Sequence, residues 1–121
     1  MKYDLNQPAI KWRIAFGNDP ELAARGITGT GAPAVNNSII ITASGLLFGA
    51  GLDNHIRAWD TDSGKQLWAS RFGGSFIGAP VMYVMQGRQY VLVAAASTTA
   101  PPAGTEAKAP MGWVAYALPG K

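Results

Sequence analysis

The sequence of 121 residues contains no cysteine and a single histidine. The absence of cysteine excludes disulfide bonds and metal sites built on thiolates. Charged residues make up only 14% of the chain, and its ten lysines and arginines are scattered rather than gathered in a run. Without a basic patch or stripe, the sequence predicts no surface for nucleic acid.

Long apolar segments are missing as well. No stretch approaches the roughly 20 consecutive apolar residues that a membrane-spanning helix requires, so no membrane segment is predicted. The opening residues, MKYDLN, lack the apolar core of a signal peptide. We therefore expect no signal peptide at this start, and the compartment stays open.

The chain is rich in apolar residues and in turn formers, with 48% hydrophobic residues, 15 glycines and 8 prolines. This composition supports a packed core and many turns. The low charge is compatible with surface that is buried in a larger assembly. It is equally compatible with a β-rich domain whose loops are rich in glycine and alanine, and composition leaves both interpretations open.

Short apolar segments alternate with turn signals, a pattern typical of all-β proteins. One helical turn is expected at residues 20–25, with Asp19 as its cap and Pro20 at its first position. The Ala-, Thr- and Pro-rich stretch 96–110 is expected to be a loop. Strands are predicted at residues 10–16, 38–43, 46–50, 55–60, 66–71, 79–85, 89–95 and 112–118.

The most informative stretch, residues 58–68, reads A-W-D-T-D-S-G-K-Q-L-W. It combines a strand end, a tight turn and the start of a second strand. Asp60 is expected to accept a backbone N–H in the turn, while Ser63 and Gly64 supply a hydroxyl and a positive φ. Lys65 then leads into a strand where the large ring of Trp68 can cover an adjacent sheet.

This pattern resembles the tryptophan-docking repeat of the pyrroloquinoline-quinone (PQQ) dehydrogenases. Further stretches resemble the same family and follow in the family's order. They are residues 42–51, Asp53 with Arg57-Ala58, and residues 78–83, 87–91 and 114–119. The last of these is similar to the membrane-bound glucose dehydrogenase branch. The resemblance assigns a structural docking motif to Ala58, Asp60, Ser63, Gly64, Lys65, Trp68 and Trp12.

The resemblance implies an all-β fold of antiparallel four-stranded β-propeller blades, with about two blades' worth of strands in this C-terminal segment. We expect one partial-propeller domain over residues 1–121, with an outer strand at 9–17, a complete blade at 35–72 and an incomplete closing blade at 78–119. The first strand lacks a blade and the last blade lacks an outer strand. Exchange of that strand between copies would satisfy both, so we expect a homo-oligomer or missing blades on another chain.

In this family a calcium ion polarises a quinone carbonyl and an aspartate acts as base. No motif for the calcium ligands or the base occurs in this chain, so we assign no catalytic residue and no metal ligand, and cofactor-binding residues stay unknown. PQQ and calcium are implied only for full-length members, which are periplasmic or membrane-attached.

The acidic residues Asp53, Asp60 and Asp62 fail the spacing of an EF-hand calcium loop and are interpreted as turn residues. Asp53 is expected to cap a turn or to pair with Arg57. His55 is interpreted as a turn-side or strand-edge residue rather than a proton-transfer group.

The tryptophans of the chain carry further expectations. Trp59 is expected in the core between blades, whereas Trp113 is the tryptophan that could approach a ligand. Trp68 is expected to be buried, and its replacement to be among the most destabilising changes.

Three functional hypotheses follow. In the first, the chain is a catalytically incomplete segment of a sugar or alcohol dehydrogenase that completes a propeller or self-assembles. In the second it is an oligomeric module that binds a small ligand, and in the third it is a subunit of a split quinoprotein enzyme.

Overall fold

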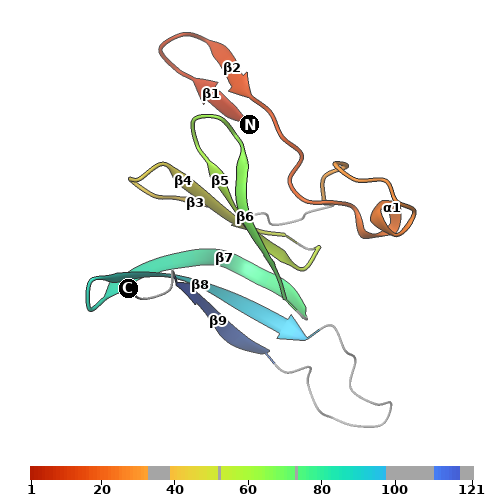
Figure 1. The fold of residues 1–121 in the computed structure, drawn as a ribbon, viewed down its shortest axis with the longest axis vertical. Helices are drawn as coiled ribbons and strands as arrows, with labels where there is room; N and C mark the ends of the chain where they lie inside the picture. The colour runs from red at the N-terminus through yellow and green to blue at the C-terminus, as the bar shows by residue number, and fades with distance from the viewer. Residues whose placement is uncertain (33–38, 52, 73, 98–110, 118–121) are drawn as a thin grey trace.

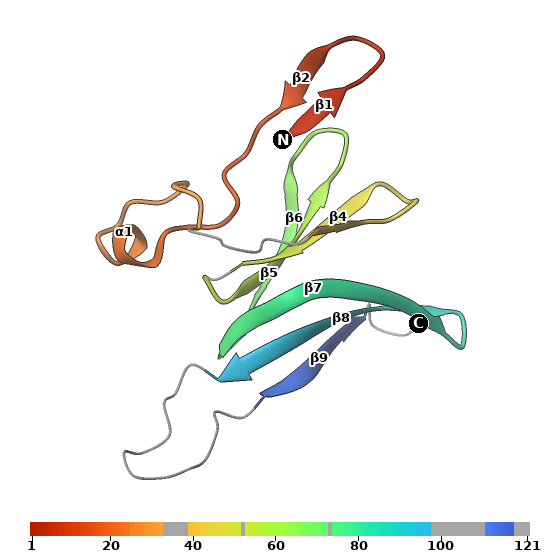
Figure 2. The same ribbon diagram turned by 180° about the vertical axis from the view of Figure 1, so that it is seen from behind.

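The computed structural model describes residues 1–32, 39–51, 53–72, 74–97 and 111–117. Nearly all regular structure in these residues is antiparallel β-sheet, in three separate sheets of which none closes on itself. Figures 1 and 2 show the three sheets in succession along the long axis, with the N-terminal hairpin at one end. The prediction of an all-β chain is confirmed.

The first sheet is a hairpin of β1 (Lys2–Asp4) and β2 (Ala9–Trp12). The predicted strand 10–16 is therefore too long, and β1 was missed. Regular strand structure ends at Trp12 because the chain then leaves the hairpin and carries Phe16 onto the second sheet, where its ring lies 5.2 Å from that of Trp59. β1 is only three residues long and offers no alternation that a sequence pattern could reveal.

The second sheet has the strand order β3 (Ile39–Ile41), β4 (Leu46–Ala50), β5 (His55–Asp60) and β6 (Gln66–Arg71). The predicted bounds of the last three strands are confirmed. β3 is shorter than the predicted 38–43, since Thr42 already belongs to the tight turn in which Gly45 N–H donates to its carbonyl. Residue 38 lies outside the described residues.

The third sheet consists of β7 (Gly74–Met85), β8 (Arg88–Ser97) and β9 (Met111–Ala117). All three predicted strands exist, but β7 begins well before residue 79. Its early part pairs with β8 across a register shift between Ile77 and Val81, which broke the expected alternation. Residues 98–110 of the predicted loop lie outside the described residues, whereas Ala96 and Ser97 still belong to β8.

One short helix, α1 (Pro20–Ala24), lies in the connection between the first two sheets. The Asp19 side chain accepts hydrogen bonds from the backbone N–H groups of Glu21 and Leu22, and Pro20 begins the helix, so this prediction is confirmed. The connection closes on itself where Ala32 N–H donates to the Phe16 carbonyl at 2.7 Å.

The core lies between the second and third sheets. Ile56 and Val93 are fully buried there, and Phe76 and Ala95 lie beside them. The other face of the second sheet is covered by the N-terminal connection, because Phe16 packs on Trp59, whose side chain is 3% exposed. The expected burial of Trp59 is confirmed, but its ring lies under the N-terminal connection rather than in the core between two sheets. The division into one partial-propeller domain stays a prediction.

Candidate functional site

The turn between β5 and β6 is held by one carboxylate. Asp60 Oδ1 accepts hydrogen bonds from the backbone N–H of Ser63 at 2.7 Å, from that of Asp62 at 3.2 Å, and from the Ser63 hydroxyl at 2.6 Å. Gly64 follows with φ +73°, and Lys65 N–H donates to Ser63 Oγ. The turn geometry predicted for Asp60, Ser63 and Gly64 is confirmed.

Trp12 from the N-terminal hairpin lies on this turn. Its indole Nε1–H donates to the Thr61 carbonyl at 3.0 Å. A Cβ added to Gly64 would lie 2.8 Å from Cδ2 of the Trp12 ring, closer than atoms pack. The turn therefore receives the indole only because residue 64 has no side chain, and the same residue supplies the left-handed backbone.

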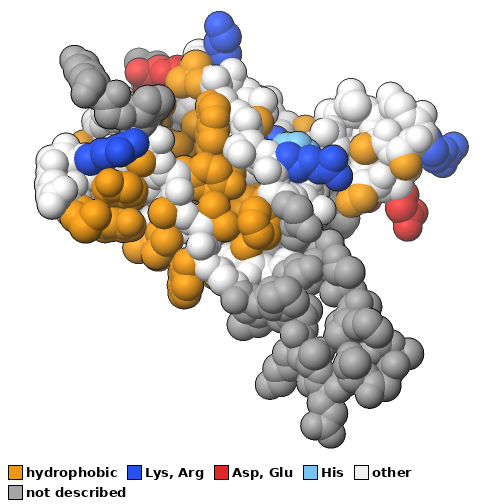
Figure 3. Space-filling view, turned by 60° about the horizontal axis from the view of Figure 1, so that its bottom comes forward, with side chains coloured by type: hydrophobic (Ala, Val, Ile, Leu, Met, Phe, Trp, Pro, Cys, Tyr) orange, Lys and Arg blue, Asp and Glu red, His pale blue; other side chains and the backbone are white. Residues whose placement is uncertain are grey.

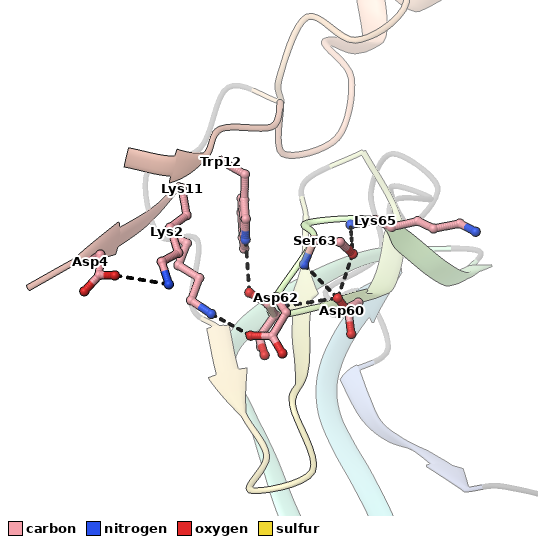
Figure 4. A network of polar contacts seen from close by, with 9 residues as sticks. Lys2, Asp4, Lys11, Trp12, Asp60, Asp62, Ser63 and Lys65 are labelled. Carbon is pink, nitrogen blue, oxygen red and sulfur yellow. Dashed lines mark hydrogen bonds and ion pairs between the residues drawn. The ribbon is translucent and has the colours of Figure 1, made fainter. Parts of the chain in front are cut away.

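Charged side chains reinforce this contact at its edge (Figure 4). Lys2 Nζ forms an ion pair with Asp62 Oδ1 at 2.8 Å, which joins the first hairpin to the turn. Within the hairpin, Lys11 pairs with Asp4 at 3.1 Å. Hydrogen bonding from Lys11 and from the backbone N–H of Asn6 lowers the pKa of Asp4. The Ser63 hydroxyl and backbone likewise lower the pKa of Asp60.

Residues 2–12 and 58–68 form the same hairpin twice. Asp4 accepts from the backbone N–H of Asn6 and Gln7, two and three residues on, as Asp60 does in its own turn. Each hairpin has a register shift just before the turn and ends with a tryptophan opposite its first residue, Lys2↔Trp12 and Ala58↔Trp68. Sequence reasoning missed Asp4, although it precedes Trp12 by the spacing that separates Asp60 from Trp68.

Trp68 is less enclosed than expected. Its side chain faces the third sheet, where its ring meets the edge of Tyr116 at a centroid distance of 5.3 Å. Trp68 nevertheless remains 38% exposed. The expectation that Trp68 is buried is therefore wrong.

A second polar centre lies at the other end of β5. Asp53 binds Arg57 with both carboxylate oxygens, one of them 2.9 Å from Nη1, and it also accepts the Asn18 backbone N–H at 3.0 Å. Burial by itself raises the pKa of Asp53, but the hydrogen bonds from Arg57 and Asn18 outweigh it and hold the pKa below its ordinary value. The predicted Asp53–Arg57 pair is confirmed, and it also fastens the N-terminal connection to the second sheet.

His55 begins β5, and its Nδ1–H donates to the Asp53 carbonyl at 2.8 Å. This position agrees with its interpretation as a strand-edge residue. His55 also lines a cavity of about 210 Å³ between α1 and the sheet.

The third sheet has one covered and one open face. Its inner face packs on the second sheet through Phe76, Val91 and Val93. We call the opposite side the outer face; it carries Val81, Tyr83, Tyr90, Leu92, Trp113 and Ala115, which the strand register aligns on one side. Val81 and Trp113 are 51% and 67% exposed, and Figure 3 shows hydrophobic side chains gathered on this side of the molecule.

The sequence matches known proteins over much of its length. The model of the family described as glucose/ethanol/alcohol dehydrogenase, beta-propeller domain, matches residues 1–91. The chain belongs to this PQQ-dependent dehydrogenase family. Its sheets are thus strands of a β-propeller domain, and the predicted resemblance and fold class are confirmed.

Individual proteins also show sequence similarity to this chain. The chain is 30% identical over 96 residues to quinoprotein glucose dehydrogenase A of Acinetobacter calcoaceticus and 33% identical over 100 residues to a probable quinate dehydrogenase (quinone) of Xanthomonas campestris pv. juglandis; each match covers 76% of this chain and 12% of the relative. It is 40% identical over 60 residues to lupanine 17-hydroxylase [cytochrome c] of a Pseudomonas species, covering 50% of this chain and 9% of the relative. The chain thus spans about a tenth of the length of these relatives.

The described residues do not form a complete site for PQQ, the cofactor that the family implies. The cavity beside His55, at about 210 Å³, is smaller than the roughly 300–1,000 Å³ of sites for larger ligands. Every buried side-chain polar atom among the described residues already has a hydrogen-bond partner. No such atom is therefore left unpaired for a cofactor to bind. No group of three or more His, Cys, Asp or Glu within the same residues is arranged to hold a metal ion. Their chemistry therefore does not make up a PQQ or calcium site.

The helical structure in the described residues is too short and too polar to span a membrane.

Proposed function

We propose that this chain is a blade-forming segment of a PQQ-dependent sugar or alcohol dehydrogenase and acts by completing a propeller. The observation that supports this role is the outer face of the third sheet. Its inner counterpart is buried against a neighbouring sheet, whereas Val81 and Trp113 on the outer face are half exposed or more. An apolar sheet face of this kind is stabilised when another sheet covers it.

The proposal assigns the joint between successive blades to the docking motif. Trp12, seated on the turn of Thr61 and Gly64, joins the first hairpin to the blade at residues 35–72. Trp68 begins an equivalent contact with the closing blade at 78–119 through Tyr116. Ala58, Asp60, Ser63 and Lys65 shape the turn that receives the indole.

On this proposal the isolated chain does not catalyse the dehydrogenase reaction, since the catalytic base and the calcium ligands belong to other blades of the family's propeller. The test is dye-linked oxidation of glucose and of quinate by the pure chain supplied with PQQ and calcium. We expect no turnover above a protein-free control. Turnover that a chelator abolishes would contradict the proposal and would favour a subunit of a split enzyme.

Self-assembly is the second candidate function. The outer face favours it, as does the position of β9 as the terminal strand of its sheet within the described residues. A homo-oligomer would cover the outer face with another copy, with strand exchange of the N-terminal segment as its geometry. The measurement is molar mass by light scattering over a range of concentrations. Trp113→Ser should reduce association, whereas Ile27→Ser, which replaces an apolar residue that is 45% exposed and lies outside both the outer face and the exchanged N-terminal segment, is the matched control and should not.

If all three chains have the same monomeric mass, self-assembly is excluded while propeller completion by blades outside this chain remains. Equal association of wild type and Trp113→Ser would show that the outer face is not the interface.

A further inference from the structure

The cavity between α1 and the second sheet carries chemistry that the proposed function does not use. Its sheet side is formed by Asp53, Asn54, His55 and Arg71, and its loop side by Asn18, Pro20 and Ala23. We infer that it binds a small oxyanion, the carboxylate or phosphate group of a small molecule, between Arg71 and His55. This inference does not depend on propeller completion.

Strand pairing brings the two basic side chains together. His55 and Arg71 lie directly opposite each other at the ends of β5 and β6. Cross-strand partners of this kind have Cβ atoms about 4.5–5.5 Å apart and side chains on the same face of the sheet. An anion placed between them can therefore contact both.

The charges around the cavity leave a positive surplus. The carboxylate of Asp53 is occupied by Arg57 and by the Asn18 backbone N–H, so it is not available to neutralise a further cation. Arg71 forms no ion pair with any carboxylate in the part of the chain that the structure describes. A guanidinium without a carboxylate partner is suited to bind a planar or tetrahedral oxyanion with two parallel hydrogen bonds.

His55 is oriented for the same purpose. Since its Nδ1–H donates to the Asp53 carbonyl, Nε2 is the ring nitrogen left for a ligand. In the protonated imidazole Nε2 carries a hydrogen and donates to an anion. The charged groups near it are Asp53 with its partner Arg57, and Arg71 across the strand pair, while the loop side contributes the uncharged Asn18, Pro20 and Ala23.

The size of the cavity favours a small ligand. A volume of about 210 Å³ lies below the roughly 300–1,000 Å³ typical of pockets for larger organic ligands. It holds several waters or one small anion. Because its walls come from both the α1 connection and the β5–β6 end of the sheet, a bound anion would join these two segments.

The single histidine of the sequence makes the test direct, since its Cε1–H resonance is unambiguous in NMR. The full chain is titrated with sodium phosphate and, separately, with sodium malonate, at constant ionic strength maintained with sodium chloride. We expect the His55 resonance to shift saturably as the concentration of the binding anion increases. The comparison of phosphate with malonate identifies which oxyanion the cavity takes.

Arg71→Gln should weaken the apparent affinity about tenfold or more, because it removes the charged, two-pronged donor. Arg13→Gln, which removes the same charge from an exposed residue outside the cavity, is the matched control and should bind as wild type does. Retained amide dispersion from β7–β9 confirms that each variant is folded. Equal effects of the two substitutions, or the absence of a saturable shift with either anion, would overturn the inference.

Discussion

At the scale of single residues, the buried Asp53–Arg57 pair is the contact whose loss should cost most. The Asp53 and Arg57 side chains are 8% and 7% exposed. Asp53→Asn would leave the guanidinium buried beside a neutral amide, and removing one partner of a buried pair costs about 3–5 kcal/mol. Urea unfolding followed by circular dichroism measures the loss. Asp62→Asn is the control, because the Asp62 side chain is 90% exposed in its pair with Lys2 and such pairs contribute little.

The same residue should make the protein sensitive to acid. The pKa of Asp53 is lowered in the folded chain, so its ionised form stabilises the fold above the pKa of the unfolded chain, about 3.9. That stabilisation is lost as the pH falls through the lowered folded value. We expect the wild-type unfolding free energy to decline below about pH 4. The profile of Asp53→Asn should be flatter there, and an equally steep decline in both proteins would refute the role assigned to Asp53.

Gly64 permits a second test at this scale. Gly64→Ala introduces a Cβ at φ +73° and at 2.8 Å from the Trp12 ring, whereas Gly26→Ala meets the left-handed cost alone, since no atom lies within 4 Å of its added Cβ. Gly26→Ala should cost about 1–2 kcal/mol. Gly64→Ala should cost about 1–3 kcal/mol more, because it displaces the indole and breaks the Trp12–Thr61 hydrogen bond.

Hydrogen exchange of the Trp12 indole N–H provides the specific readout. We expect it to accelerate in Gly64→Ala and to stay slow in Gly26→Ala. Similar exchange in the two variants would show that Gly64 does not seat the indole.

At the scale of elements, β5 and β6 present two tryptophans in contrasting settings. Trp59 lies near the end of β5, an inner strand of the second sheet, under Phe16 and is 3% exposed, whereas Trp68 is 38% exposed. Trp59→Ala should cost about 3–5 kcal/mol and Trp68→Ala about half as much. Thermal melting of both variants checks the order. A larger loss of stability for Trp68→Ala than for Trp59→Ala would contradict this order. It would support the expectation from the motif that replacing Trp68 is among the most destabilising changes.

Turn chemistry explains which elements were predictable. The bounds of β4, β5 and β6 follow from turn residues at their ends, such as Gly45, Asp60 and Gly64, whose chemistry is local. β1 was missed because its partner strand is also only a few residues long, and short strands carry little periodic signal. The extension of β7 before residue 79 depends on pairing with β8 across a register shift, which is a property of two strands rather than of one.

At the scale of the whole molecule, deletion of residues 1–17 tests whether the N-terminal segment joins copies. β2 already pairs with β1, so any exchanged unit would be a strand released from this hairpin or the hairpin itself. If strand exchange builds the assembly, light scattering should show an oligomer for the full chain and a smaller species after deletion. A full chain that is a folded monomer, or a deletion variant that keeps the assembly, would contradict strand exchange.

The deletion also removes Phe16 from Trp59 and so uncovers the far face of the second sheet. Hydrogen exchange in β7–β9, which lie on the other side of the core, distinguishes a lost interface from an unfolded chain.

The sequence by itself determined the all-β class, the family and the turn at residues 60–64. These depend on chemistry that neighbouring residues supply to one another, such as the carboxylate of Asp60, the hydroxyl of Ser63 and the missing side chain of Gly64. The Asp53–Arg57 ion pair could be predicted for the same reason, since the two residues are close to each other in the sequence.

Only the tertiary structure decided what those local units contact. Three features depend on segments that are distant in sequence. They are the contact of Trp12 with Gly64, the partial exposure of Trp68, and the cavity between α1 and the second sheet. Their geometry depends on strand register and on the stacking of sheets. Local residue patterns do not encode these, because the same apolar alternation is compatible with many neighbours.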